Sequence, residues 1–401
     1  MIQFPPRRRS LLVVCHTYPP VLGGSEVEAQ RICASLRRRG HDVLVVCSGQ
    51  PAMPKVIDWV DPYGTRVRIF GRRWPAPWRD FAFAFAVGWT LLWRRYDVVY
   101  FLMQGLHLAS GLPVARLRRK PILMKFSGSS LISALTRSWL GRLELSFLRR
   151  WAASIMILNS GMEQEAAAAG LSRQHLFWMP NPVDVDEFCP LDSDQRQRLR
   201  VKLGIASSAL VILFVGRLAP EKELPSLLNA FGRVAAHYPD AMLVIVGDGP
   251  EGERLAARAG ELGLTAHVRF AGRANETGVR KWLQAADLFA LVSSNEGFPC
   301  SLVEAMATAL PSVVSDIPGN TQLITDNVHG LIAEVRNEDA LAHAMISLLA
   351  DADLRVRLGW AARQSVVENY STDLVVERYE RLFAEALSVP EPSVTIENNV
   401  R

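Results

Sequence analysis

The chain has 401 residues, of which 49% are hydrophobic and 21% are charged. That length predicts two domains, and the composition excludes a wholly disordered protein. Residues 1–190 carry 25 basic and 13 acidic side chains, a net charge of +12, whereas the rest of the chain carries 20 and 27, a net charge of −7.

This uneven charge bears on the partners of the first half. A strongly basic half suggests contact with something anionic, such as a membrane surface or a phosphorylated acceptor. The alternative is that clusters such as Arg37–Arg39 are solvated at the end of a helix, where cations suit the helix dipole. A nucleic-acid partner is not expected, because the sequence has no basic and aromatic stripe of a known nucleic-acid module.

The spacing of the cysteines and the length of the apolar runs indicate in which cellular compartment the protein works. The five cysteines form no CxxC pair, which favours free thiols in a reducing compartment. The apolar run Leu11–Cys15 is shorter than the roughly 7–15 residues of a signal peptide, so we interpret it as a buried strand. The 13-residue run Phe81–Trp93 is too short for a bilayer span of roughly 20 residues and predicts a buried or, at most, interfacial helix. We therefore expect a cytoplasmic protein, at most peripheral on the inner face of the membrane.

Short β-branched segments alternate with helical segments along the first half. This alternation is typical of a parallel sheet with crossover helices. The clearest helix is 25–39, with Ser25 as its candidate N-cap. The predicted strands are 11–15, 42–47, 67–70, 97–102, 121–126, 154–158 and 175–179.

The alternation stops near residue 180 and then restarts. Residues 179–194 contain three prolines and many turn-forming residues, which predicts a linker. Strands are predicted again at 210–215, 242–246, 267–270, 287–292, 311–315 and 330–335. We expect two Rossmann-like α/β domains that face each other, with ligands at the carboxyl ends of their strands. The expected divisions are a first domain over 1–183, a linker over 184–206, a second domain over 207–370, a last helix over 371–388 and a tail over 389–401.

The strongest chemical signal is NEGFPCSLVEAMA, at 295–307. Glu296 lies in a loop after a predicted strand, and Glu304 lies in the first turns of the helix that follows. Free backbone N–H groups near Ser301 and Leu302 would form an anion site at the start of that helix. A sugar nucleotide offers hydroxyls for the two carboxylates and a diphosphate for the N–H groups. The alternative is an ordinary loop and helix with two solvated glutamates.

The second signal is VGRLAPEKEL, at 215–224, directly after a predicted strand. Arg217 and Lys222 could clamp a diphosphate, the arginine through its planar fork and the lysine as a compact charge. Such a clamp would stabilise a departing nucleotide. The alternative is that Lys222 merely pairs with Glu221 or Glu223 on the surface.

The third signal is HTYPPVLGGSEVEAQ, at 16–30, where a strand leads through two glycines into a helix. Gly23 and Gly24 would let the backbone approach a phosphate or a sugar closely. A turn that only connects strand to helix explains the glycines equally well.

A fourth pattern favours a different class of enzyme. Gly247, Gly249 and Gly252 match the G-x-G-x-x-G of dinucleotide-binding proteins. The acidic residue expected about 20 residues later is absent, so an NAD oxidoreductase is a minor alternative. The sequence has no P-loop, HExxH or GxSxG motif.

Taken together, these segments resemble the retaining glycosyltransferases of family four, also called group 1, which have the GT-B architecture. The resemblance covers nearly the whole chain. The segments that carry it are PPxxGGxE (19–26), NPVDVDEF (181–188), GRLxxEK (216–222), GDGPE (247–251) and the Glu-x(7)-Glu segment (296–304).

The resemblance implies a role for each matching residue. Arg217 and Lys222 would bind the donor diphosphate, Glu304 the ribose and Glu296 the donor sugar. The family uses a nucleoside-diphosphate sugar as co-substrate, with no cofactor and no metal, and its last helix crosses back onto the first domain. Further donor contacts are implied for Gly23, Gly24, Gly216, Gly297, Phe298, Ser301 and Leu302.

The chain departs from the family pattern on the acceptor side. Many relatives have a histidine after the fifth strand of the first domain, where this chain has Ser127. Serine donates a hydrogen bond but is never a cation at neutral pH. His16 and His107 lie on other loops and could compensate, or could be plain polar loop residues. The usual Asn-Gly of the linker is Asn181-Pro182 here.

The leading hypothesis is a glycosyltransferase that builds a polysaccharide, a glycolipid or another glycoconjugate with retention. Its acceptor would be a carbohydrate or a lipid-linked molecule, and the Trp-rich stretch 74–93 suggests an anionic membrane surface. The alternative is a non-catalytic subunit that binds a nucleotide sugar, which the missing histidine favours and the intact donor motifs oppose.

Overall fold

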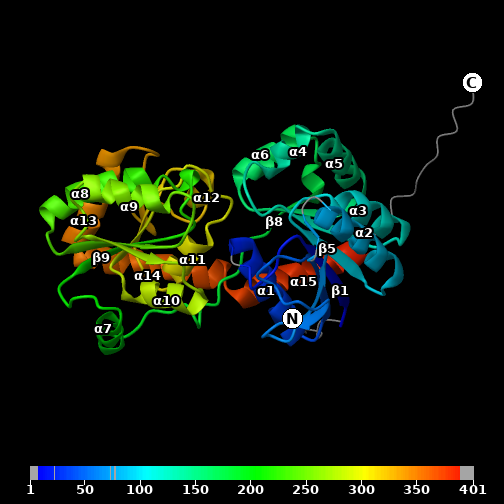
Figure 1. The fold of residues 1–401 in the computed structure, drawn as a ribbon, viewed down its shortest axis with the longest axis horizontal. Helices are drawn as coiled ribbons and strands as arrows, with labels where there is room; N and C mark the ends of the chain where they lie inside the picture. The colour runs from blue at the N-terminus through cyan, green and yellow to red at the C-terminus, as the bar shows by residue number, and fades with distance from the viewer. Residues whose placement is uncertain (1–7, 22, 73, 76–77, 389–401) are drawn as a thin grey trace, which may run out of the picture.

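The computed structural model describes residues 8–21, 23–72, 74–75 and 78–388 and shows two α/β domains side by side (Figure 1). The predicted tail, 389–401, lies outside the described residues. Each domain is built on a largely parallel sheet of buried aliphatic strands with helices packed on it, as the alternating pattern predicted. The predicted fold class is confirmed.

The first sheet has the order β3-β4-β2-β1-β5-β6-β7-β8, and only the β3–β4 pair is antiparallel. The sequence missed β3 because it has only three residues, and two of them, Asp58 and Val60, are exposed. The strands of this sheet are β1 (Ser10–Cys15), β2 (Asp42–Ser48), β3 (Asp58–Val60), β4 (Arg66–Phe70), β5 (Val98–Leu102), β6 (Ile122–Lys125), β7 (Ala152–Ile157) and β8 (Leu176–Trp178).

Six helices of the first domain connect these strands. The candidate N-cap at Ser25 is wrong: α1 begins one residue earlier, and the extended Gly23 is its N-cap. A Cβ on Gly23 would meet only the carboxylate end of the Glu26 side chain, so the structure does not require glycine at this position. The helices are α1 (Gly24–Arg38), α2 (Trp78–Trp93), α3 (His107–Leu117), α4 (Leu131–Thr136), α5 (Trp139–Trp151) and α6 (Ser160–Ala168).

The second sheet is all parallel, with the order β11-β10-β9-β12-β13-β14. Its strands are β9 (Leu210–Val215), β10 (Ala241–Val246), β11 (Val268–Gly272), β12 (Leu288–Leu291), β13 (Ser312–Ser315) and β14 (Gly330–Ala333). Its helices are α7 (Ser193–Lys202), α8 (Leu224–His237), α9 (Gly252–Glu261), α10 (Glu276–Ala285), α11 (Cys300–Ala307), α12 (Pro318–Thr321), α13 (Glu338–Ala350) and α14 (Ala352–Asn369).

Helix α7 lies inside the segment expected as a linker. Its Arg196 and Arg200 both form ion pairs with Asp287, at the start of β12. The second domain therefore begins within 184–206, and the free connection is shorter than expected.

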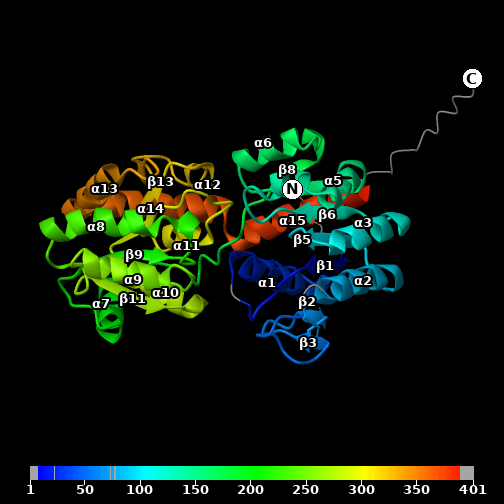
Figure 2. The ribbon, with the colours of Figure 1, turned by 45° about the horizontal axis from the view of Figure 1, so that its top comes forward.

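The chain crosses between the domains twice, and the two crossings lie side by side. Val183 N–H donates to Tyr370 O at 3.0 Å, and Thr372 N–H donates to Val183 O at 3.0 Å. Beyond the second crossing, α15 (Thr372–Ser388) packs against α1 and β7 of the first domain. Figures 1 and 2 show this helix, in red, among the elements of the first domain.

The apolar segment 81–93 forms most of α2 and has two different faces. Phe83, Val87 and Leu91 are buried in the core of the first domain, as predicted. The other face is open, with Phe85 71% exposed and Trp93 67% exposed. Among the helices that the structure describes, none combines the length and apolarity needed to cross a bilayer.

Candidate active site

Glu296 and Lys222 meet at the carboxyl ends of two neighbouring strands of the second domain. Lys222 closes the short 3-10 turn η2 (Pro220–Lys222) after β9, and Glu296 lies in the loop after β12. Nζ of Lys222 lies 2.5 Å from Oε1 of Glu296, and Ser293 Oγ donates to the same oxygen at 2.6 Å. Both charged side chains are mostly buried, so each strongly restrains the other.

The loop that carries Glu296 is held against the first domain. Ser129 Oγ donates to Glu296 O at 2.8 Å, and Asn159 Nδ2 donates to Gly297 O at 2.7 Å. Gly297 permits this approach, because a Cβ there would lie 2.9 Å from the Cα of Gly128. Asn159 and Ser129 thus support the loop from the opposite domain, and no local pattern in the sequence predicted either contact.

Arg217 does not join the Lys222–Glu296 pair in this structure. Its side chain is 67% exposed and pairs with Glu221, one turn later. It lies at the same end of β9 as Lys222, and its length leaves it free to turn toward a ligand bound there.

The glycines of the GDGPEG segment have a packing role. Gly247 has a φ of +151°, and a Cβ there would lie 1.8 Å from the carbonyl oxygen of Gly216. A Cβ on Gly249 would lie 2.4 Å from Leu218 O. These residues therefore let the loop after β10 pack directly on the loop that carries Gly216 and Arg217, which accounts for the glycines without a dinucleotide.

Glu304 faces the first domain from α11. Nη2 of Arg31, on α1, lies 2.8 Å from Oε1 of Glu304 and 2.6 Å from Oε1 of Glu276 on α10. Burial raises the pKa of Glu304, and the Arg31 guanidinium acts in the opposite direction. Arg31 also donates to Pro182 O at 3.2 Å and so ties both sides of the interdomain site together. Sequence analysis did not single out Arg31.

The start of α11 lies opposite the glycines of the first domain. A Cβ on Gly24 would be 3.5 Å from Sγ of Cys300, the first residue of α11. Ser301 is half-buried there. The expectation of a free N–H at Leu302 is wrong, because that group donates to Pro299 O at 3.0 Å as the helix starts. Phe298 is buried with its ring edge-on to Tyr370, 5.8 Å between centroids.

The acceptor-side candidates follow three strands of the first domain: His16 and Ser127 lie on loops after β1 and β6, whereas His107, which was expected on a loop, is the first residue of α3. His107 is buried, its ring centroid 5.2 Å from that of Phe83, and burial lowers its pKa to about 3. Burial also lowers the pKa of His16, with Asp80 3.9 Å away acting in the opposite direction. Neither ring is therefore a cation at neutral pH. Ser127 Oγ is buried without a hydrogen-bond partner among the described residues, as are His107 Nε2 and Gln104 Oε1.

A buried ion pair that the sequence did not reveal lies behind these loops. Lys125, at the end of β6, pairs with Glu28 of α1, and both side chains are fully buried. Its Nζ also lies 2.9 Å from Oδ1 of Asn181 and 3.3 Å from the Tyr379 hydroxyl. One cation thus joins β6, α1, the first interdomain crossing and α15.

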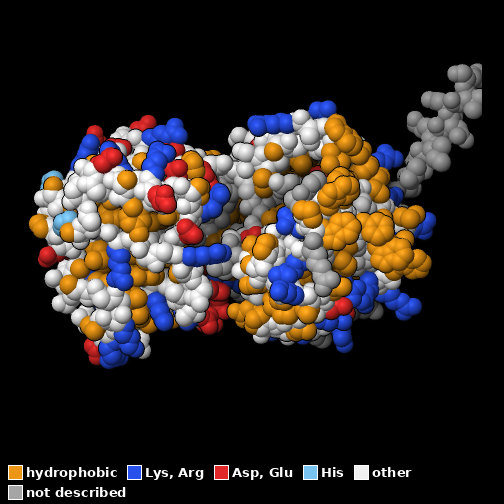
Figure 3. All heavy atoms as spheres, viewed as in Figure 1, with side chains coloured by type: hydrophobic (Ala, Val, Ile, Leu, Met, Phe, Trp, Pro, Cys, Tyr) orange, Lys and Arg blue, Asp and Glu red, His pale blue; other side chains and the backbone are white. Residues whose placement is uncertain are grey.

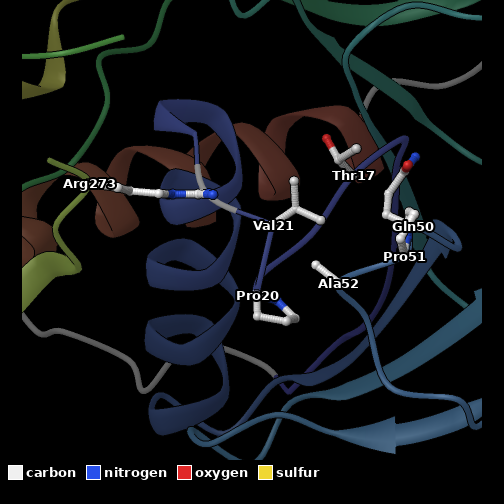
Figure 4. Close-up of a pocket in the computed structure, with 7 residues that line it drawn as sticks. All are labelled: Thr17, Pro20, Val21, Gln50, Pro51, Ala52 and Arg273. Carbon is white, nitrogen blue, oxygen red and sulfur yellow. The ribbon is translucent and has the colours of Figure 1, made fainter. Parts of the chain in front are cut away.

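A pocket of about 600 Å³ opens between the domains at the carboxyl ends of β1 and β2. In Figure 4 the Arg273 side chain extends from the second domain toward the loop that carries Val21. Within the described residues no group of three or more His, Cys, Asp or Glu side chains could hold a metal ion. The pocket is lined by Thr17, Pro20, Val21, Gln50, Pro51, Ala52 and Arg273.

Known proteins with similar sequences are glycosyltransferases. A D-inositol 3-phosphate glycosyltransferase of Jonesia denitrificans is 34% identical over 212 residues, which is 50% of this chain and 50% of that relative. The chain therefore spans only half the length of this relative. The N-acetyl-alpha-D-glucosaminyl L-malate synthase of Bacillus anthracis is 25% identical over 380 residues, 92% of this chain and 95% of the relative.

Solved structures show the same two-domain arrangement. HepE of Anabaena, crystallised with UDP and glucose, has a TM-score of 0.79 at 21% identity, over 94% of this chain and 100% of that one. Sucrose-phosphate synthase of Thermosynechococcus elongatus has a TM-score of 0.79 at 18% identity, over 94% of this chain and 99% of that one. At these identities the likeness shows the fold.

Two family models divide the chain between them. The model of glycosyltransferase family 4 matches residues 22–187 in the first domain, and the model of group 1 glycosyl transferases matches residues 195–365 in the second. The chain therefore belongs to the family 4, or group 1, glycosyltransferases and has their two-domain GT-B fold.

Proposed function

We propose that the protein transfers a sugar from a nucleoside-diphosphate sugar to an acceptor, with retention of the anomeric configuration. The observation that carries this proposal is the pairing of Lys222 with Glu296 at the carboxyl ends of β9 and β12. In an open parallel sheet this edge is where ligands bind. A cation and a carboxylate held together there suit a ligand that joins an anionic diphosphate to a hydroxyl-bearing sugar.

On this proposal the second domain binds the donor. Lys222 and Arg217 carry the charge of the diphosphate and stabilise it as the glycosidic bond breaks. Glu296 accepts hydrogen bonds from the sugar, and Glu304 from the ribose. Because Oε1 of Glu304 already accepts from Arg31, a bound ribose would share this carboxylate with the first domain.

We propose that transfer needs no metal ion or cofactor, because Arg217 and Lys222 would supply the positive charge at the diphosphate. Retention would follow a front-face route in which the departing phosphate oxygen takes the proton of the acceptor hydroxyl. The bond from the anomeric carbon to the phosphate oxygen breaks while the bond to the acceptor oxygen forms on the same face. This route needs no protein base, which agrees with Ser127 in place of an imidazole and with the burial of His107, which lowers its pKa to about 3 and so makes it a weak base.

The acceptor would bind the first domain, near the unpartnered oxygens and nitrogen of Ser127, Gln104 and His107. One relative supports the class of acceptor proposed here: a Corynebacterium glutamicum mannosyltransferase named for a monoacylated phosphatidylinositol monomannoside. We propose a carbohydrate or lipid-linked acceptor, and a protein that works in the cytoplasm or at the inner face of the membrane.

Nucleotide-dependent stabilisation tests the donor site. Purified protein would be heated with UDP, GDP, ADP, their sugar conjugates or NAD. At about 100 times its dissociation constant, a ligand should add roughly 2.7 kcal/mol to the free energy of unfolding. We expect one nucleoside diphosphate to raise the melting temperature, and Lys222→Ala and Glu304→Ala to abolish the shift.

Lys202→Ala is the matched control, because this exposed lysine lies on α7, outside the site. Stabilisation that survives in the Lys222 and Glu304 variants would contradict the donor site, and a shift with NAD alone would contradict the function. Nucleotide binding without sugar transfer to any acceptor would favour the non-catalytic subunit.

A further inference from the structure

Helix α2 carries a stripe of aromatic side chains on its outer face. Trp78, Phe81, Phe85, Trp89 and Trp93, here called the aromatic stripe, are between 57% and 71% exposed. They follow one another at intervals of three or four residues and so lie on one side of the helix. Neighbouring rings along the stripe are in contact, with centroids 6.2 Å apart for Phe85–Trp89 and 5.6 Å apart for Trp89–Trp93.

The stripe is not needed to attach α2 to the domain. The opposite face of the helix already packs into the core through Phe83, Val87 and Leu91. A helix that is apolar on all sides is normally buried on all sides. Here nothing in the described chain covers the outer face, and large exposed apolar patches on soluble domains mark binding surfaces.

Neighbouring helices extend this surface. Leu117, at the end of α3, is 73% exposed, and Trp139, at the start of α5, is 72% exposed. Figure 3 shows the apolar side chains gathered over this part of the first domain, with lysine and arginine at its margins. The apolar surface thus extends beyond α2 to two further helices.

A cluster of cations lies at one end of the stripe. Arg94 and Arg95 follow α2, and Arg118, Arg119 and Lys120 follow α3. The two groups adjoin, since Nη2 of Arg118 reaches Arg94 O at 3.5 Å. Within the described residues none of these five cations is paired with a carboxylate.

Acidic side chains are almost absent from the same region. Between Asp80 and Glu144 the sequence contains one carboxylate, Asp97, which accepts a hydrogen bond from the backbone of Ser10. Glu144 itself is buried. Asp58, on β3, has its pKa lowered mainly by its hydrogen bond from Arg68 and also by the charge of Arg94. The surface therefore combines exposed aromatic rings with an excess of positive charge.

We infer that the aromatic stripe and its cation cluster form the surface by which this protein docks on an anionic lipid bilayer. Tryptophan rings favour the headgroup level of a bilayer, and arginines beside them attract anionic headgroups. A second copy of the chain fits less well, because the stripe offers no carboxylates for the arginines of its partner. This inference rests on the proposed function in one respect: docking would bring the enzyme to a lipid-linked acceptor.

Vesicle flotation without any nucleotide sugar tests the docking surface apart from sugar transfer. Wild-type protein should float with vesicles that contain phosphatidylglycerol and much less with vesicles of phosphatidylcholine alone. Phe85→Ser/Trp89→Ser should lower the partition coefficient by roughly tenfold or more, since two rings no longer leave water. Arg94→Glu/Arg95→Glu should remove the preference for the anionic vesicles.

Trp360→Ser is the matched control, because Trp360 is 55% exposed on α14 of the second domain. This variant should float like the wild type, and all variants should keep the wild-type melting temperature. Wild-type protein that stays unbound, or binding that survives Phe85→Ser/Trp89→Ser, would overturn the inference. A wild-type dimer in light scattering that becomes a monomer in the Phe85→Ser/Trp89→Ser variant, without vesicle binding, would assign the surface to a second copy instead.

Discussion

Glu144 is a carboxyl group that folding removes from water. It lies on α5 with 2% of its surface exposed, and burial raises its pKa from 4.5 to about 7. Between pH 4.5 and about 7, the folded state therefore holds a proton on Glu144 that the unfolded chain has released. Its contribution to stability is therefore full below pH 4.5 and is lost as pH rises toward about 7.

Replacing Glu144 should remove that pH dependence. We expect Glu144→Gln to reduce the fall in unfolding free energy between pH 5 and pH 8 by about 2 kcal/mol. Urea denaturation at the two pH values measures it. Glu253→Gln, on an exposed position of α9, is the control and should keep the wild-type slope. An unchanged slope in the Glu144 variant would show that the group titrates as it does in water.

At the residue scale the sequence predicted positions at strand ends but missed side-chain contacts. Lys222 and Glu296 are 74 residues apart, and the sequence placed each of them after a strand of the same sheet, although it did not predict their ion pair. Arg31 reaches Glu304 over 273 residues and from the other domain. No spacing within α1 distinguishes Arg31 from a solvated arginine, because its partners are set by how the two domains face each other.

At the scale of elements, α1 and β6 are joined by the buried Glu28–Lys125 pair. Removing one partner leaves the other charge uncompensated in the core, which typically costs about 3–5 kcal/mol. Replacing both by apolar side chains of similar length avoids that penalty. We expect Lys125→Met to be strongly destabilising and Glu28→Met/Lys125→Met to recover most of the loss.

A double-mutant cycle in urea measures this coupling. The single variants should each lose more stability than the double variant. Additive losses would mean that the two side chains contribute independently. Nucleotide binding by the double variant would confirm that the donor site of the second domain remains intact.

The elements themselves were largely predictable, since all but one of the strands were foreseen from buried β-branched runs. The exception, β3, is too short and too exposed to give such a run. For α2 the sequence showed a continuous apolar run but not its two faces. The sequence of α2 alone does not tell which of its aromatic rings are buried in the core, because their burial depends on how the helix packs on the neighbouring strands.

At the scale of the whole molecule, the end of the chain completes the core of its beginning. Val376, Tyr379 and Phe383 of α15 are buried in one cluster with the residues of β1 and α1. The sequence shows α15 only as an apolar-striped helix after the second domain, and its return to the first domain came from family resemblance alone. The side-by-side crossings at Val183 and Ser371 make this return short.

Loosening α15 should therefore weaken the first domain and spare the second. Phe383→Ala removes a ring that is 1% exposed, a change that typically costs about 3–5 kcal/mol. We expect amide hydrogen exchange to accelerate in β1, β2 and α1, while β9, β10 and β12 keep their protection, because the core around those strands contains no residue of α15. Leu387→Ala, at a 42% exposed position of the same helix, is the control. Equal acceleration in both domains would mean that the molecule unfolds as one unit.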